Sequence, residues 1–230
     1  MPPQIPELLP DIPGGWTEQE FAVGADTYNL IVPADPDAFL DDATVAQRNA
    51  ENDYMPYWAF MWPSAPMAAA TLRFAPWKAG SRVLEVGCGL GLVGLAGLKR
   101  GDQVVFSDYD ELPLTLVREN AIRNGLGEPE TLLLDWRIPQ DVTFDAIVGC
   151  EVTYDAALHS ILLEMLKSTL SPNGVCWLSD PGRMQAPNFL KAARDFGFRV
   201  TILDQNGSPL AEPTVQQFQI FELRHPQQSA

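Results

Sequence analysis

Strand-like and helix-like segments alternate through the middle of the chain, and this alternation limits the fold more than any other feature of the sequence. Helix-like runs over 91–100, 111–124 and 155–170 stand between strand-like runs. Helices of this length connect parallel strands by right-handed crossovers. The pattern therefore predicts an α/β fold with helices on both faces of a mostly parallel sheet. The strand-like runs are RVLEVG (82–87), QVVFSD (103–108), TLLLD (131–135), FDAIVGC (144–150) and GVCWLSD (174–180).

Two further strands, FRVTILD (198–204) and VQQFQIFEL (215–223), follow a predicted helix over 186–196. No helix separates these two strands, so we expect an antiparallel edge and seven strands in all. The residues before the first parallel strand predict a hairpin with its turn near Gly24, an acidic, partly helical stretch, and a helix after an aromatic segment. The expected organisation is a flexible N-terminal arm (1–15), one domain (16–224) divided into an N-terminal hairpin and aromatic entry segment (16–78) and a core (79–224), and a tail (225–230).

The charge of the chain limits its partners. Its 230 residues carry a formal net charge of −15. Phosphates would be repelled, so neither a nucleic acid nor an anionic membrane is an expected partner, whereas a basic partner would be attracted. The three cysteines form no CxxC pair and no histidine cluster accompanies them, so we expect free thiols and no metal site. With no leader-like N-terminus and no apolar run of membrane length, we expect a cytoplasmic monomer.

The segment LEVGCGLGLVGLAGLKRG (84–101) joins the first parallel strand to a helix through a turn rich in glycine. Such a turn can hold a nucleotide-like ligand against the backbone. Gly89, Gly91 and Gly94 satisfy the GxGxxG pattern of dinucleotide sites, which by itself is weak evidence. A dinucleotide, S-adenosylmethionine and a tight turn without a ligand are all compatible with these glycines.

Glu85 favours S-adenosylmethionine among these alternatives. Glu85 and Gly87 point to the same side of the strand, near its C-terminal end. A carboxylate there would repel a pyrophosphate and attract an ammonium group. S-adenosylmethionine carries an ammonium and a sulfonium and no phosphate. A unit charge pair at ~4 Å is worth about 4 kcal/mol at an effective dielectric constant of about 20. The sign of the ligand's charge therefore favours S-adenosylmethionine over a dinucleotide.

Acidic residues also end the next two strands. Asp108 is placed to accept hydrogen bonds from both ribose hydroxyls, a role that a dinucleotide site shares. Asp110 competes for this role, but it precedes a helix with proline in its first turn, so we expect it to be a helix N-cap. Asp135 can accept a hydrogen bond from an adenine amine, and Trp136 can cover the ring.

Several motifs together resemble those of one family. EVGCGLG, SDYD and LLLDW occur in the order typical of the seven-strand, Rossmann-like (class I) methyltransferases. The segment YWAFMWPSA and the run GCEVTYD resemble methyltransferase family 16, the protein lysine methyltransferases. SDPGR and PYWAFMWP are similar to the branch that includes the electron-transfer-flavoprotein beta-subunit lysine methyltransferase. The resemblance covers roughly residues 20–223.

This resemblance implies roles for particular residues. The cofactor would contact the glycine turn, the three acidic residues at the strand ends and three further positions. The implied cofactor residues are Trp62, Glu85, Gly87, Gly89, Gly91, Asp108, Asp135, Trp136 and the backbone near Cys150. The family's DxxY signature is ExxY here, formed by Glu151 and Tyr154. These two are the expected catalytic residues: Glu151 would bind and orient the acceptor amine, and Tyr154 would offer its ring or hydroxyl.

The sequence thus predicts a methyltransferase that uses S-adenosylmethionine to methylate a nitrogen, and a lysine in a protein is the expected acceptor. Two alternatives remain open at this point. The acceptor could be a small amine, because one fold hosts both kinds of substrate. The chain could also be a non-catalytic interaction module that binds S-adenosylmethionine.

Overall fold

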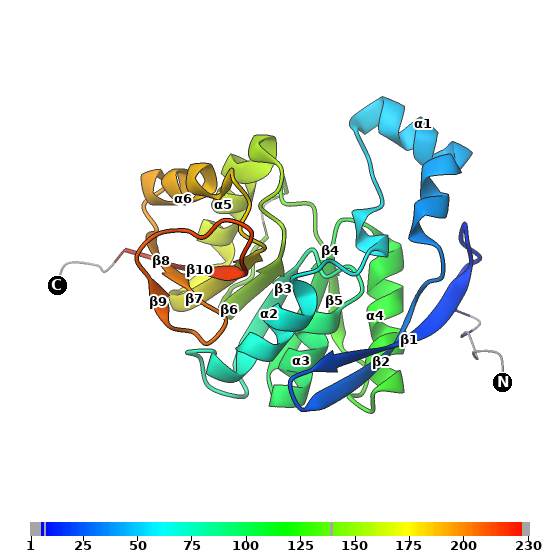
Figure 1. Cartoon of the computed structure of the whole chain (residues 1–230), viewed down its shortest axis with the longest axis horizontal. Helices are drawn as coiled ribbons and strands as arrows, with labels where there is room; N and C mark the ends of the chain where they lie inside the picture. The colour runs from blue at the N-terminus through cyan, green and yellow to red at the C-terminus, as the bar shows by residue number, and fades with distance from the viewer. Residues whose placement is uncertain (1–5, 7, 139, 227–230) are drawn as a thin grey trace.

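The computed structural model describes residues 6, 8–138 and 140–226. An eight-stranded sheet with strand order β5-β4-β3-β6-β7-β10-β8-β9 forms the centre of the molecule (Figure 1). The pairs β5–β4, β4–β3, β3–β6 and β6–β7 are parallel, as the alternation of strands and helices predicts. The strands of this sheet are β3 (Arg82–Val86), β4 (Gln103–Asp108), β5 (Glu130–Leu133), β6 (Phe144–Cys150), β7 (Leu170–Asp180), β8 (Arg199–Leu203), β9 (Pro209–Leu210) and β10 (Gln219–Arg224).

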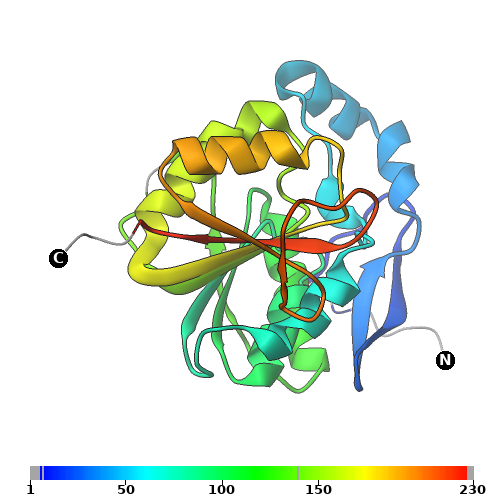
Figure 2. The same cartoon turned by 60° about the vertical axis from the view of Figure 1, so that its left-hand side comes forward.

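Helices cover both faces of the sheet, because alternate strand residues point to opposite sides. Val83 of β3 packs in a hydrophobic cluster with α2, α3 and α4, whereas Leu84 and Val86 pack in a second cluster with α5 and α6. Figure 2 shows α6 on the side of the sheet opposite α2. The helices are α1 (Ala43–Asn52), α2 (Ala65–Thr71), α3 (Leu92–Arg100), α4 (Glu111–Arg123), α5 (His159–Thr169) and α6 (Ala186–Asp195), with 3-10 turns η1 (Pro36–Asp41), η2 (Tyr57–Ala59), η3 (Leu72–Phe74) and η4 (Ala156–Leu158).

The C-terminal strands are antiparallel to their neighbours, as expected, but their order across the sheet does not follow their order in the chain. β10 lies between β7 and β8 and is antiparallel to both. The short β9, which the sequence does not predict, pairs antiparallel with β8 at the edge. Sequence alternation indicates that two strands pair, but it does not say which neighbour each one takes.

The N-terminal hairpin is attached to α4 by side-chain amides. Strands β1 (Trp16–Val23) and β2 (Asp26–Pro33) pair antiparallel, and β1 begins earlier than the sequence suggests. The amide of Asn120 accepts from the N–H of Ile31 at 2.7 Å and donates to its carbonyl at 3.2 Å. Asn124 makes the same pair of bonds with Asn29, both at 2.9 Å. The two amides thus bond the backbone of β2 much as a neighbouring strand would.

The described part of the N-terminal arm packs against the body, contrary to the expectation of a flexible arm. Leu9 is 7% exposed and belongs to the hydrophobic core. The indole nitrogen of Trp16 donates to the carbonyl of Pro10 at 2.8 Å. Residues 1–5 and 7 of the arm, and 227–230 of the tail, lie outside the described residues. Within the described part of the chain, no helix is both long and apolar enough to span a bilayer.

Candidate active site

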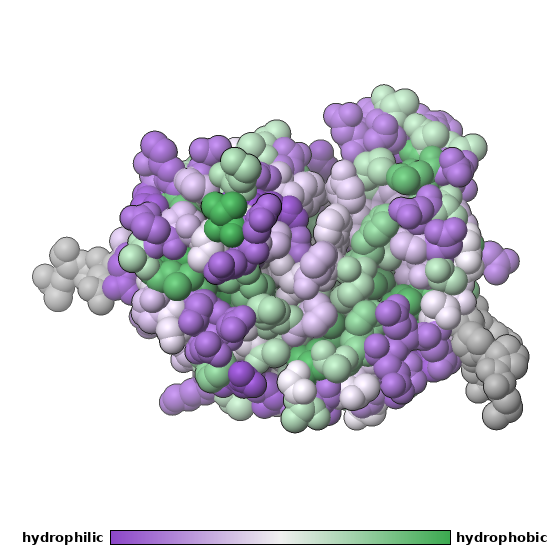
Figure 3. All heavy atoms as spheres, in the orientation of Figure 1, coloured by the Kyte–Doolittle hydropathy of each residue, from purple (hydrophilic) through white to green (hydrophobic). Residues whose placement is uncertain are grey.

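A cavity of ≈ 890 Å³ opens at the C-terminal ends of the parallel strands. Its walls come from the glycine turn after β3, the loops after β4, β5 and β6, and the segment between α1 and α2. The space-filling view shows the surface hollowed between the α1 side and the α5–α6 side of the molecule (Figure 3). In open α/β sheets, ligands bind beyond this end of the strands, at the point where the chain leaves the central strands in opposite directions. Here β3 and β6 flank that point.

The glycine turn requires backbone conformations that other residues rarely adopt. Gly87, Gly89 and Gly91 have φ of 62°, 50° and 81°, and all three line the cavity. At Gly94, the last glycine of the GxGxxG pattern, glycine is required for a different reason. A Cβ there would lie 2.3 Å from Oε2 of Glu85. The last position of the pattern therefore serves a contact within the protein.

Glu85 lies in the floor of the cavity and is 2% exposed. Its Oε2 accepts a hydrogen bond from the backbone N–H of Gly94 at 3.1 Å. Burial raises the pKa of this carboxyl group to about 8. A cationic ligand nearby would favour the ionised form. Contact with an ammonium group, the role expected from the sequence, stays a prediction.

Asp108 and Asp110 occupy the loop after β4 and have different partners. Asp108 accepts from the N–H groups of Gly89 at 3.0 Å and Asp110 at 3.2 Å, and burial raises its pKa to about 6. Asp110 stands at the N-cap position of α4, as predicted, but its side chain makes no cap bond. Its carboxylate accepts instead from the Tyr54 hydroxyl at 2.6 Å and from Arg48 at 3.1 Å. Asp110 thereby ties α1 and the residues after it to the cavity wall.

Asp135 and Trp136 both line the cavity, beyond the end of β5 at Leu133. The Asp135 carboxylate is paired with Arg137 through bonds of 2.8 Å from Nε and from Nη2. This pairing lowers the pKa of Asp135. An adenine amine would have to share the carboxylate with Arg137, so the adenine-binding role stays a prediction.

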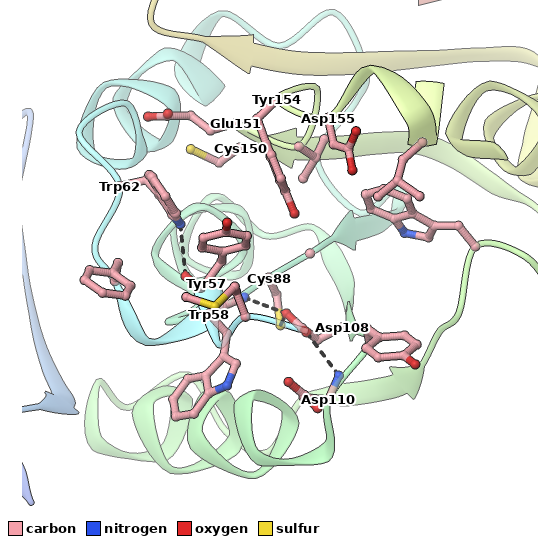
Figure 4. Close-up of a pocket in the computed structure, with 18 of the residues that line it drawn as sticks. Tyr57, Trp58, Trp62, Cys88, Asp108, Asp110, Cys150, Glu151, Tyr154 and Asp155 are labelled. Atoms are coloured by element: carbon pink, nitrogen blue, oxygen red, sulfur yellow. Dashed lines mark hydrogen bonds between the residues drawn. The ribbon is translucent and has the colours of Figure 1, made fainter. Parts of the chain in front are cut away.

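Aromatic rings line the side of the cavity nearest Tyr154. The rings of Tyr57 and Tyr154 meet edge to face at 5.4 Å, and those of Tyr57 and Trp62 lie 6.0 Å apart. The Trp62 indole donates to the carbonyl of Tyr57 at 3.1 Å. Figure 4 shows the Tyr154 side chain pointing into the cavity, toward Asp108. Tyr57 was not singled out individually, although the sequence identifies the aromatic segment that contains it.

Glu151 lies on the same wall, but its carboxylate points away from the Tyr154 hydroxyl (Figure 4). It is 4% exposed. Oε1 accepts from the backbone N–H of Ser64 at 2.9 Å, and Oε2 accepts from the guanidinium of Arg183. The structure therefore does not present this carboxylate free for an acceptor amine. Cys150, next to it, also lines the cavity. The sequence assigns no role to Arg183, which ends the run SDPGR.

Acidic side chains outnumber basic ones in the lining of the cavity. Among the described residues that line it, Arg137 is the one basic side chain, and it is paired with Asp135. Such a cavity favours a cationic ligand over a phosphate-bearing one. The acidic lining residues are Asp53, Glu85, Asp108, Asp110, Asp135, Glu151 and Asp155.

Solved structures with the same architecture define the class. A TehB-like SAM-dependent methyltransferase from Corynebacterium glutamicum superimposes with a TM-score of 0.59 over 84% of this chain and 100% of that one, at 17% identity. A ribosomal protein L11 methylase from Lactobacillus delbrueckii gives 0.58 over 71% and 79%, at 22% identity. The fold is thus that of the Rossmann-like, class I methyltransferases, as the sequence predicts.

Sequence comparison identifies the family within this class. The profile of the family described as lysine methyltransferase matches residues 60–195, more than half of the chain. The protein belongs to this family, and S-adenosylmethionine is the cofactor that the membership implies.

Curated relatives are similar over part of their length. The electron transfer flavoprotein beta subunit lysine methyltransferase of Danio rerio is 32% identical over 56% of this chain and 52% of its own. The histidine protein methyltransferase 1 homolog of Dictyostelium discoideum is 31% identical over 44% and 35%. The matches thus span about a third to a half of the relatives' length.

Proposed function

We propose that this protein transfers a methyl group from S-adenosylmethionine to a nitrogen, the side-chain amine of a lysine in a protein substrate. The observation that carries the proposal is the acidic cavity at the glycine turn, in a chain of the lysine methyltransferase family. The names of the relatives support a protein acceptor, since they include methyltransferases of electron transfer flavoprotein and of EEF1A.

The residues of the cavity fit the cofactor. Gly87 and Gly89 line the cavity with a positive φ, and the N–H of Gly89 donates to Asp108, which lines it too. We propose that Asp108 holds the ribose hydroxyls and that Glu85 stabilises the ammonium group. Trp62 and Trp136 also line the cavity and are proposed to cover the ligand, together with the backbone at Gly91 and Cys150. When bound, the cofactor supplies an electrophilic methyl group on a sulfonium that leaves as a neutral thioether.

The protein's own contribution is to align the amine and exclude water. A lysine amine, with its pKa near 10.4, arrives protonated. The ring faces of Tyr57 and Tyr154 would attract that cation, and the hydroxyl of Tyr154 can accept a hydrogen bond from it. Burial beside a positive charge lowers the pKa of the amine, which favours the neutral nucleophile. We propose Tyr154 as the residue that contacts the acceptor, with Glu151 holding the wall behind it.

The proposal is tested by incubating the protein with S-adenosyl-[methyl-³H]methionine and a cell lysate. Label in protein, released as methyl-lysine by acid hydrolysis, is the expected result, and Tyr154→Ala should remove most of it while S-adenosylhomocysteine still binds. Label only in small molecules would replace the protein acceptor with a small amine. Methyl-histidine would replace lysine as the acceptor. Cofactor binding without transfer would favour a non-catalytic module.

The cytoplasmic location and the monomeric state stay predictions. Cys88, Cys150 and Cys176 are free thiols in the structure, which supports a reducing compartment.

A further inference from the structure

Hydrogen bonds within the turn after β7 hold Arg183 in a fixed position. Oδ1 of Asp180 accepts hydrogen bonds from the N–H of Gly182 at 2.7 Å, the N–H of Arg183 at 2.9 Å and the amide of Gln219 at 3.1 Å. Gly182 has a φ of +83°, and a Cβ there would lie 2.5 Å from the backbone nitrogen of Gln217. Three residues of SDPGR thus have related parts: Asp180 closes the turn, Gly182 fits it, and Arg183 follows it.

The guanidinium of Arg183 lies between two buried carboxylates. It pairs with Glu151, and its Nε is 3.8 Å from Oδ2 of Asp180. The side chain of Arg183 is 20% exposed, whereas those of Glu151 and Asp180 are 2% and 1% exposed. Arg183 is absent from the described residues that line the cavity, whereas Glu151 is among them. Among these lining residues, Glu151 is the one whose carboxylate bonds the guanidinium of Arg183.

Glu151 in turn joins the two segments that carry the aromatic wall. Its Oε1 accepts from Ser64, which ends the segment that contains Tyr57 and Trp62. Its backbone N–H donates to the carbonyl of Ser179 in β7, at a distance of 3.0 Å. The φ of Glu151 is 55°, in the left-handed region. Tyr154 follows three residues later. The carboxylate thus connects the two sides of the ring pair that meets at 5.4 Å.

We propose that Arg183 is a positioning residue for methyl transfer: by pairing with Glu151, it holds Tyr57 and Tyr154 at the separation that the acceptor amine needs. The inference rests on the proposed function and gives Glu151 a different part in it from the one expected from the sequence. Removing the arginine leaves a buried carboxylate without its cation. The carboxylate then turns toward water or another donor, and the aromatic wall loses its alignment.

The test compares Arg183→Met with Arg100→Met. The Arg100–Asp102 pair is matched in burial, with side-chain exposures of 19% and 0%, and both of its residues lie outside the lining of the cavity. Initial rates of tritium transfer into a fixed amount of lysate protein are measured at varied S-adenosylmethionine, per mole of folded protein. We expect the maximal rate of Arg183→Met to fall at least about tenfold, while the KM for S-adenosylmethionine stays within about twofold. Arg100→Met should lose thermal stability without losing rate.

Two further variants separate positioning from folding. Arg183→Lys keeps the charge and should recover part of the rate. In a Glu151→Gln background, Arg183→Met should cost less than about threefold, because the arginine acts through that carboxylate. Equal losses of rate in Arg183→Met and Arg100→Met, or full additivity with Glu151→Gln, would overturn the inference. If Arg183→Met does not fold, the rates of Arg183→Lys are compared instead, alone and in the Glu151→Gln background.

A structural readout keeps the inference testable if the parent protein transfers no label, an outcome that sinks the proposed function alone. Crystal structures of the parent and of Arg183→Met with S-adenosylhomocysteine are then compared. A lost bond between Ser64 and Glu151, with a changed separation of the Tyr57 and Tyr154 rings, supports the positioning role. Unchanged rings in the variant refute it.

Discussion

Replacing Glu85 with glutamine should stabilise the protein without its cofactor, and the effect should grow with pH. The carboxyl group is buried, and its pKa rises from 4.5 to about 8 on folding. Because the folded state holds the proton more tightly than the unfolded state, this group favours folding fully below about pH 4.5. The contribution is lost as the pH rises through about 8.

The magnitude follows from the same shift. Each pH unit in that range costs the folded parent about 1.4 kcal/mol relative to a side chain that does not titrate. Between about pH 6 and about pH 8 the parent should therefore lose about 2 kcal/mol against Glu85→Gln, because the folded group is half ionised at the upper end of this range. The glutamine carbonyl can still accept the bond from Gly94, so the comparison isolates the charge.

Urea unfolding at several pH values measures the difference directly. S-adenosylhomocysteine, titrated calorimetrically in buffers of different ionisation enthalpy, supplies the second readout. The parent should release protons on binding near pH 7, since the ligand ammonium favours the ionised Glu85, and the variant should bind more weakly and release fewer. A stability difference between the two proteins that does not change from about pH 6 to about pH 8 would refute the reasoning.

Three other substitutions address separate parts of the structure. Tyr54→Phe removes the 2.6 Å bond to Asp110 and should speed dissociation of S-adenosylhomocysteine about fivefold in stopped flow, whereas an unchanged rate would mean that α1 does not restrict the cavity. Gly91→Ala places a Cβ 2.5 Å from a valine of α4 at a positive φ and should cost about 3 kcal/mol in urea unfolding. Gly80→Ala, which has a similar φ and open space around it, should cost about 1 kcal/mol, and equal costs would remove the steric argument. Asn120→Ala should lower the free energy of unfolding by about 2–3 kcal/mol, because buried backbone groups of β2 lose their partners, and a loss below about 0.5 kcal/mol would contradict that account.

The sequence correctly predicts which residues the parallel strands bring together. Glu85, Asp108 and Asp135 are far apart in the chain, yet all three line one cavity, because the C-terminal ends of parallel strands meet at one edge of the sheet. Strand boundaries are less certain: β5 ends at Leu133, two residues before the predicted end. Local periodicity fixes the element but not its last residue.

Pairs of side chains on separate loops could not be predicted. Tyr54 and Asp110 are 56 residues apart, and Arg183 and Glu151 are 32 apart. Which carboxylate meets which cation depends on how the loops pack, and no periodicity encodes this. The side chain of Asp110 therefore looked like a helix cap, and Glu151 looked available for a substrate amine, until their partners were located in three dimensions.

The amide ladder between α4 and β2 has a consequence for how this chain can be shortened or recombined. The family match begins at residue 60, yet Asn120 and Asn124, inside it, spend their hydrogen-bonding capacity on the hairpin that precedes it. A protein trimmed to the matched region would expose the buried side of α4 and remove the bonds that the two amides make with β2. A chimera with a related protein should therefore take the hairpin and α4 from the same parent.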